Sequence, residues 1–462
     1  MMKEQWTKLF SSYDIRGVFG QEIDTEFGER LGTAFGALIA PDRQGRFIIG
    51  HDVRLSSSDM SAAFIRGLLE QGHEVVDLEL ASTPMISWCG WAEEFDGIAS
   101  ITASHLGSHY NGFKLSRRGA MPIDSKTDIP LLKELFFRSE TEPRSGGRFK
   151  KANRLGRYVE MLKGFLHQPK RRIRLGVDVG NGAAGHEVHM LSELLASTVE
   201  IHSIFTAPDG SFPNRSSNPL DEGALDHLRR LVFEKSLDFG VALDGDADRC
   251  IVIDEQGQLV EPDFVLALIA VHLINSQESG SVVHDLRCSK SVAEHIAAAG
   301  GRAVATKVGY PNIRKSIMES RALFGGELSG HYYYGDMNGI DNALRTVVEL
   351  INILGSDEAA RPLSQFVQPL KRFHGSGEIT IHSANAKDCI EDLKTRFADA
   401  PANYLDGITV DFGEWWFNAR ASGTESAVRL IVESNQASRL TDRVEALSEL
   451  IAGVSPVPAS IF

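Results

Sequence analysis

The chain has 462 residues, too many for one hydrophobic core, and at roughly one domain per 100–200 residues it predicts three or four domains. Its hydrophobic content of 42% is ordinary for a globular protein, and no apolar run approaches the ~20 residues that cross a bilayer, which excludes a membrane-spanning protein. The net charge of −14 argues against nucleic-acid binding, which depends on clustered lysine and arginine.

The first third of the chain alternates short apolar runs with amphipathic helical patterns. Residues 47–50 predict a strand, and residues 60–69 predict the helix after it. Apolar residues three or four apart between Phe27 and Leu38 predict another helix with one apolar face. This alternation indicates a βαβ rhythm.

The same rhythm restarts twice further along the chain. After a polar stretch at residues 140–157 it begins again at residues 173–179, and a third time at residues 280–285. From about His374 the pattern changes to a strand, a helix, three strands in quick succession and a final helix. The three strands are predicted at residues 407–412, 415–420 and 428–433. We therefore predict three α/β units followed by a smaller α+β domain.

Three aspartates at alternate positions form the sharpest motif of the sequence. Asp244, Asp246 and Asp248 follow the apolar strand predicted at residues 239–242, with small residues between them. Carboxylate oxygens suit Mg²⁺, which demands near-octahedral oxygen coordination. The motif therefore predicts a magnesium site, with an acidic surface turn as the alternative.

A serine follows another apolar strand, predicted at residues 98–101. Ser104 stands on the loop beyond the strand end, where an α/β sheet places reactive groups. No Gly-x-Ser-x-Gly elbow surrounds it, so acyl transfer is not indicated. Taken alone, a turn or cap serine is the simpler interpretation.

Two further motifs are suited to a sugar phosphate. The loop at residues 420–426 sets Arg420 beside small residues and hydroxyls, a combination that can wrap a phosphate dianion. Glu327, Ser329 and His331 alternate, which would project them together from an extended segment, and a carboxylate beside a hydroxyl can grip sugar hydroxyls. By itself the first stretch is equally well explained as a polar hairpin loop, and for the second a glycine-rich turn is the simpler interpretation.

In this order, and from Tyr13 to Arg429, the motifs resemble those of the α-D-phosphohexomutase family. Residues 13–17 resemble its opening motif, 50–54 its second strand, 102–105 its phosphoserine loop, 244–249 its metal loop, 326–331 its sugar-recognition loop and 420–425 its phosphate clamp. Glu327 with Ser329, and the run at residues 110–114, are most similar to the phosphomannomutase/phosphoglucomutase branch, because phosphoglucosamine mutases tend to carry an aspartate where Tyr110 stands.

The resemblance implies a four-domain α/β architecture around a central cleft. Three similar mixed α/β domains would precede a C-terminal α+β domain like the TATA-box-binding protein (TBP-like). The expected domains are residues 1–152 with the phosphoserine loop, 153–255 with the metal loop, 256–370 with the sugar-recognition loop and 371–462 with the phosphate-binding loop.

The resemblance also implies a set of site residues. The expected catalytic residues are Ser104, Lys114, Arg16 and His331, and the expected metal ligands are Ser104, Asp244, Asp246 and Asp248. The expected substrate-binding residues are Tyr13, His105, Arg249, Arg287, Gly309, Tyr310, Glu327, Ser329, His331, Arg420, Ser422, Gly423 and Thr424.

The activity implied is that of a phosphohexomutase, an isomerase that acts as an intramolecular phosphotransferase. It would interconvert the 1- and 6-phosphates of mannose or glucose through a phosphoserine enzyme, with Mg²⁺ as cofactor and hexose 1,6-bisphosphate as intermediate and activator. The alternatives are a phosphoglucosamine mutase, a metal-dependent sugar-phosphate phosphatase and a regulatory sugar-phosphate-binding protein. We expect a phosphosugar as partner, no nucleic acid and no membrane, and the absence of a targeting signal predicts a cytoplasmic location.

Three places depart from the family pattern. Leu106 and Gly107 stand where Asn-Pro is usual, Arg287 stands where a lysine is common, and Tyr310 stands where some members have histidine. Because glycine permits backbone angles that proline forbids, we expect a more mobile serine loop. The other two changes bear on sugar specificity rather than on the type of reaction.

Overall fold

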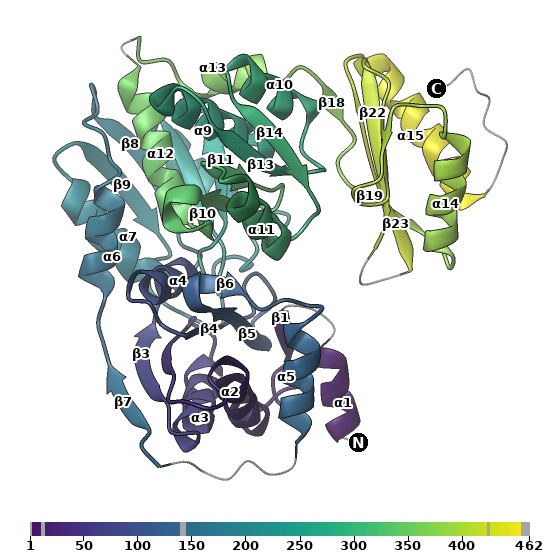
Figure 1. Cartoon of the computed structure of the whole chain (residues 1–462). Coiled ribbons are helices and arrows are strands. Elements are labelled where there is room, and N and C mark those ends of the chain that lie inside the picture. The colour runs from purple at the N-terminus through teal and green to yellow at the C-terminus, as the bar shows by residue number, and fades with distance from the viewer. Residues whose placement is uncertain (1, 11–13, 139–144, 358, 423–425, 454–462) are drawn as a thin grey trace. The chain divides into compact units, whose positions relative to one another are not determined.

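The computed structural model describes residues 2–10, 14–138, 145–357, 359–422 and 426–453, and Figure 1 labels its elements. The chain forms two compact units, of which unit 1 comprises Met1–Pro262 and Ser329–Gln365, and unit 2 comprises Asp263–Leu328 and Phe366–Phe462. Within the described ranges, no helix is both long and apolar enough to cross a membrane.

The first sheet of unit 1 runs in the order β1-β5-β4-β2-β3-β7, with β6 beside β5. Strands β4, β2, β3 and β7 are parallel to one another, and β5 runs antiparallel to β1 and β4. The strands are β1 (Asp14–Val18), β2 (Arg46–His51), β3 (Glu74–Leu80), β4 (Gly97–Ile101), β5 (Tyr110–Arg117), β6 (Met121–Pro122) and β7 (Arg148–Lys151).

Helices cover both faces of this sheet, as Figure 1 shows, with α2, α3 and α5 on one side and α4 on the other. Asp24 caps α2 by accepting a hydrogen bond from the Phe27 N–H, and the apolar face from Phe27 to Leu38 is buried, as predicted. Helices α2 and α3 approach closely, because a Cβ atom at Gly32 would lie only 2.1 Å from the Phe64 carbonyl oxygen. The helices are α1 (Met2–Leu9), α2 (Thr25–Ile39), α3 (Ser57–Glu70), α4 (Thr83–Ala92) and α5 (Asp128–Phe137).

The second sheet of unit 1 runs in the order β12-β11-β10-β8-β9, with β10, β8 and β9 parallel. Its strands are β8 (Ile173–Asp178), β9 (Val199–Ile204), β10 (Phe239–Leu243), β11 (Cys250–Asp254) and β12 (Leu259–Val260). Around it lie α6 (Leu155–Lys163), α7 (Gly185–Leu195), α8 (Asp226–Lys235) and α12 (Ala343–Ser356), and unit 1 also holds the hairpin of β16 (Tyr332–Tyr334) and β17 (Ile340–Asp341).

Unit 2 contains a parallel group of strands and a separate antiparallel sheet. The parallel strands are β14 (Arg302–Thr306), β13 (Ser281–Asp285) and β15 (Phe324–Gly326), with helices α9 (Pro262–Gln277), α10 (Lys290–Ala298) and α11 (Tyr310–Ser320). The antiparallel sheet has the order β18-β23-β22-β21-β20, with β19 also on β23, and its core packs against α14 and α15. Its elements are β18 (His374–Gly375), β19 (Ile379–His382), α14 (Ala386–Arg396), β20 (Ala402–Asn403), β21 (Ile408–Asp411), β22 (Trp415–Ala421), β23 (Ala427–Ser434) and α15 (Ala437–Ala452), and α13 (Leu363–Val367) precedes them.

The sequence-based prediction of α/β units followed by an α+β region is confirmed. Strands β2, β8 and β13 begin each repeat of the rhythm, and β21, β22 and β23 match the three closely spaced strands. The domain limits at residues 152, 255 and 370 stay predictions.

Candidate active site

Ser104 lies just beyond the carboxyl end of β4, in a backbone conformation that serine rarely adopts. Its φ of +52° is left-handed, and the residue is fully buried. The Ser104 N–H donates to Thr102 Oγ1 at 2.8 Å, while Ser104 Oγ donates to Asp244 Oδ2 at 3.0 Å and lies 3.3 Å from His105 Nδ1. A strained backbone that is held by its neighbours is characteristic of a functional position.

A buried ion pair at the end of β2 holds this serine loop from behind. The Arg54 Nε donates to Asp52 Oδ2 at 3.0 Å, and both side chains are almost completely buried. The Asp52 carboxylate also accepts the hydroxyls of Ser57 and Thr102, which satisfies the buried charge. The guanidinium of Arg54 donates to four backbone carbonyls of the loop, those of Ser104, Leu106, Gly107 and Tyr110. The conformation of the loop is thus fixed through its backbone.

The three aspartates of the predicted metal loop follow β10 and converge beside Ser104. One oxygen from each of Asp244, Asp246 and Asp248 lies within 4.8 Å of the others, and all three residues are buried. Burial, with repulsion from Asp248 and Asp246, raises the pKa of Asp244 above its ordinary value. Within the described part of the chain, Asp246 Oδ1 is a buried oxygen without a hydrogen-bond partner. Such a crowded, undersatisfied set of hard oxygens fits a divalent cation such as Mg²⁺.

Lys114, on β5, neutralises part of this negative charge. Its Nζ donates to Asp246 Oδ2 at 2.9 Å and also bonds the Asp248 carboxylate. Burial opposes the ammonium charge, but the attraction of Asp246 and Asp248 outweighs it and raises the pKa of Lys114 above its ordinary value. Lys114 therefore stays protonated and acts as a fixed positive charge beside the serine.

Burial and the cations around the serine keep His105 neutral. Burial, followed by the charges of Arg249, Arg16 and Lys114, lowers the pKa of His105 to about 2. Arg16 is oriented by Asp14, whose Oδ2 accepts from its Nη2 at 2.6 Å, and Arg249 lies with its Nε 3.7 Å from Asp244 Oδ2. The predicted catalytic and cationic residues of unit 1 are thus brought together.

His331 links the metal loop to a predicted sugar-binding hydroxyl. Its Nε2 lies 3.1 Å from Asp248 Oδ1, and its Nδ1 lies 2.8 Å from Ser329 Oγ. The prediction that residues 327–331 form an extended segment is wrong. Strand β15 ends at Gly326 and a turn follows, with Gly330 at a φ of +86°, because that backbone angle is incompatible with a continuing strand.

Unit 2 holds a second group of predicted site residues. Asp285, at the end of β13, binds Arg287 through two nitrogens at 2.7 and 3.2 Å and accepts the Leu328 N–H at 3.1 Å. Arg287 Nη2 lies 4.0 Å from Glu327 Oε2, so Asp285 orients both an arginine and the start of the sugar-recognition loop.

Some of the remaining predicted site residues lie in described elements, and others lie outside the described residues. Gly309 caps α11 with a φ of +107° and Tyr310 begins that helix, whereas Arg420 and Ser422 lie at the end of β22. Tyr13, Gly423 and Thr424 lie outside the described residues.

The N-terminus of α4 contacts the metal loop through a residue that sequence reasoning missed. Thr83 donates its hydroxyl to Asp246 Oδ2 at 2.8 Å and its N–H to the Asp246 carbonyl at 3.0 Å. The preceding Ser82 caps the helix and donates both its N–H and its hydroxyl to the Glu187 carboxylate, at 3.0 and 2.8 Å. Glu187, on α7, therefore holds the N-terminus of α4 in place, and that N-terminus in turn holds Asp246.

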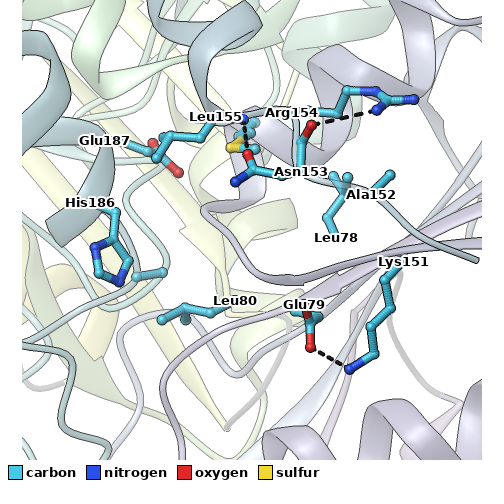
Figure 2. A pocket seen from close by; sticks show the side chains of 12 residues that line it. Leu78, Glu79, Leu80, Lys151, Ala152, Asn153, Arg154, Leu155, His186 and Glu187 are labelled. Carbon is cyan, nitrogen blue, oxygen red and sulfur yellow. Dashed lines mark hydrogen bonds and ion pairs between the residues drawn. The ribbon is translucent and has the colours of Figure 1, made fainter.

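Glu187 lines a cavity of about 350 Å³ that is separate from the serine (Figure 2). Figure 2 shows Glu187 and its neighbour His186 on one side of it, and the ion pair of Lys151 with Glu79 on the other. Burial raises the pKa of Glu187 to about 7. The same cause raises the pKa of the nearby Cys89 to about 12 and that of Tyr158 well above its ordinary value, so neither competes with Glu187 near neutral pH.

Replacing Glu187 by glutamine should remove a pH-dependent loss of stability. In the folded chain Glu187 keeps its proton up to about pH 7, whereas its ordinary pKa is 4.5, so its stabilising effect is complete at low pH and is lost as pH rises through 7. Between pH 5 and pH 8 the unfolding free energy of wild type should therefore fall by about 2–3 kcal/mol relative to that of Glu187→Gln. Urea titration at each pH measures both. Glu193→Gln, on the exposed side of the same helix, is the control, and an equal pH slope in Glu187→Gln and wild type would contradict the assignment.

Two of the residues that were missed from the sequence share one signal. Asp52 follows β2 and Asp285 ends β13, so both stand at the carboxyl ends of parallel strands, the edge where α/β proteins place functional groups. That rule could have identified these two carboxylates. Thr83 and Glu187 had no comparable signal.

Comparisons with known proteins identify the family of this chain. Family models for phosphoglucomutase/phosphomannomutase alpha/beta/alpha domains I, II and III match residues 7–142, 156–257 and 261–373, and the sheet-rich C-terminal part completes a four-domain architecture. The chain is 33% identical over 438 residues to a phosphomannomutase of Escherichia coli K12, covering 92% of this chain and 94% of that protein.

Two further relatives extend the similarity to nearly the whole chain. A protein of Xanthomonas campestris named phosphohexose mutases is 33% identical over 455 residues, which is 96% of this chain and 99% of that one. The crystal structure of a phosphoglucomutase/phosphomannomutase family protein from Burkholderia thailandensis matches with a TM-score of 0.88 at 27% identity, covering 99% of both chains. The chain therefore belongs to the phosphoglucomutase/phosphomannomutase family and is a hexose phosphate mutase, an isomerase that acts as an intramolecular phosphotransferase.

Proposed function

We propose that the enzyme interconverts the 1- and 6-phosphates of mannose and glucose, and that Ser104 carries the phosphoryl group in transit. The observation that carries the proposal is the position of Ser104 Oγ, buried and 3.0 Å from Asp244 Oδ2 at the edge of the three-aspartate cluster. The relatives named phosphomannomutase support mannose phosphate as a substrate.

In the proposed reaction, a free hydroxyl of the bound hexose phosphate attacks the phosphorus atom on Ser104 Oγ. The bond from phosphorus to the sugar oxygen forms while the bond to Oγ breaks, and the hydroxyl proton passes to a base, for which His331 is the candidate. The products are unmodified Ser104 and a hexose 1,6-bisphosphate. Return of its other phosphoryl group to Ser104 releases the isomerised monophosphate and regenerates the starting enzyme.

The charges around Ser104 suit this transfer. The fixed positive charges of Lys114, Arg249 and Arg16 would stabilise the transferring phosphoryl group, since phosphoryl transfer depends chiefly on positioning and charge neutralisation. Mg²⁺ bound by Asp244, Asp246 and Asp248 would supply further positive charge. The ion pairs of Lys114 with Asp246 and Asp248 support an electrostatic role for this residue.

The residues of unit 2 would bind the rest of the substrate. Arg420 and Ser422 would hold the phosphate that is not transferred, and Glu327, oriented by Arg287, would accept hydrogen bonds from sugar hydroxyls. Few contacts to the sugar itself are expected, because the bisphosphate must bind in both orientations. Free hexose 1,6-bisphosphate would load Ser104 and so activate the enzyme.

The test is phosphorus NMR of the purified enzyme with Mg²⁺ and a catalytic amount of glucose 1,6-bisphosphate. Mannose 1-phosphate, glucose 1-phosphate and glucosamine 1-phosphate are supplied separately. We expect mannose 6-phosphate and glucose 6-phosphate to appear, and their rates of formation rank the two sugars. Exclusive conversion of glucosamine phosphate would contradict the proposed substrates, and release of free phosphate without isomer would contradict the mutase reaction.

A further inference from the structure

Glu378, the residue before β19, places its carboxylate between two arginines of unit 2. Its Oε2 accepts a hydrogen bond from Arg420 Nη2 at 2.7 Å and lies 3.7 Å from Arg287 Nη1. The same carboxylate oxygen thus contacts both guanidinium groups. Both arginines are predicted substrate-binding residues, whereas Glu378 has no predicted role.

Asp285 and Glu378 both pair with Arg287, but they differ in exposure. The Asp285 side chain is fully buried and binds Nε and Nη2 of Arg287, an arrangement that fixes the guanidinium plane. The Glu378 side chain is 27% exposed and faces Nη1 instead. Asp285 is therefore a permanent partner, whereas Glu378 can exchange its contacts for those of a soluble anion.

A phosphate group has the chemistry to replace this carboxylate. Guanidinium groups bind carboxylates and phosphates through the same paired N–H donors, and phosphate brings more oxygens and a greater charge. An anion already at the site lowers the net gain from binding a second one, because the guanidinium charge is partly neutralised.

We propose that Glu378 occupies the phosphate-binding position of Arg420 when no substrate is bound, and that it exchanges with the substrate's phosphate in every turnover. The inference rests on the proposed function, which assigns Arg420 to the phosphate that is not transferred. During turnover the bisphosphate must release one phosphate from Arg420 and present the other. A carboxylate that returns to the arginine as the phosphate leaves replaces the lost ion pair, so it accelerates release at the expense of affinity.

The test compares phosphate binding by wild type and by Glu378→Gln, using inorganic phosphate as the probe in isothermal titration calorimetry. Glutamine keeps the size of the side chain but removes its charge. Glu378→Gln should bind inorganic phosphate about tenfold more tightly, which corresponds to about 1.4 kcal/mol. Glu391→Gln, in an exposed ion pair with Lys394 on α14, is the matched control and should bind like wild type.

A double variant tests whether the gain in phosphate affinity depends on Arg420. Because Glu378 acts through Arg420, Arg420→Gln with Glu378→Gln should bind inorganic phosphate no more tightly than Arg420→Gln alone. A gain that persists without Arg420 would overturn the proposal. So would unchanged or weaker binding by Glu378→Gln, because that result would make Glu378 a residue that orients the arginines.

Steady-state kinetics distinguish a failure of the Glu378 exchange from a failure of the proposed function. With mannose 1-phosphate, Glu378→Gln should lower both KM and kcat, since a tighter phosphate leaves more slowly. Wild type that forms no isomer would refute the proposed function, whereas active wild type with a raised KM in Glu378→Gln would refute the exchange alone.

Discussion

Ser104→Ala should lower mutase turnover by at least about 10³-fold while leaving the fold intact. The hydroxyl that carries the phosphoryl group is lost, and no hydroxyl among its described hydrogen-bond partners can take its place, because Thr102 Oγ1 is committed to the Ser104 N–H and to Asp52. The measurement is isomer formation from mannose 1-phosphate in a phosphorus NMR assay with Mg²⁺ and glucose 1,6-bisphosphate.

Ser108→Ala is the control, since Ser108 is an exposed serine on the same loop. Intact-mass spectrometry after incubation with glucose 1,6-bisphosphate should show one added phosphoryl group on wild type and on Ser108→Ala, but none on Ser104→Ala. Isomer formation by Ser104→Ala near the wild-type rate, or a phosphoryl group on it, would remove Ser104 from the mechanism.

Asp246→Asn should weaken magnesium binding by at least about 100-fold and lower turnover in proportion at low magnesium concentrations. Asparagine keeps the shape of the side chain, but it halves the number of carboxylate-type oxygens at the position and removes the charge. The Asp246 Oδ1 atom is buried and has no hydrogen-bond partner among the described residues, so it is a candidate ligand atom for an ion. The measurement is turnover as a function of magnesium concentration, together with calorimetric titration of magnesium.

Asp226→Asn is the matched control, because Asp226 is exposed on α8 and pairs with Arg229. Its magnesium dependence should equal that of wild type. If Asp246→Asn required no more magnesium than this control, the assignment of the three aspartates as the metal site would be wrong.

The parts of the structure that the sequence predicted are those set by local patterns. Strand β10 and the loop after it could be recognised because an apolar run ends in alternating aspartates within ten residues. Strand β4 could be recognised in the same way, as an apolar run, and Ser104 by its place just after that run. Helix α2 is predicted because its apolar residues recur at helical spacing.

The parts that it did not predict depend on contacts between distant segments. Thr83 meets Asp246 across 163 positions of the chain, and Ser82 meets Glu187 across 105. No periodicity within either segment encodes such a pairing, because the pairing depends on how distant parts of the chain pack together. The prediction of an extended segment after β15 is wrong for a local reason. Alternating polar residues predict a strand only where every residue has extended backbone angles, and the positive φ of Gly330 interrupts one.

The contacts of Arg54 have an evolutionary consequence. Its guanidinium binds four carbonyl oxygens, which every amino acid supplies, and no side chain of the loop among the described residues 102–110. Positions 106 and 107 can therefore accept different residues while the backbone path to the serine is retained. Leu106 and Gly107, where the family resemblance leads us to expect Asn-Pro, keep the carbonyl groups that Arg54 binds.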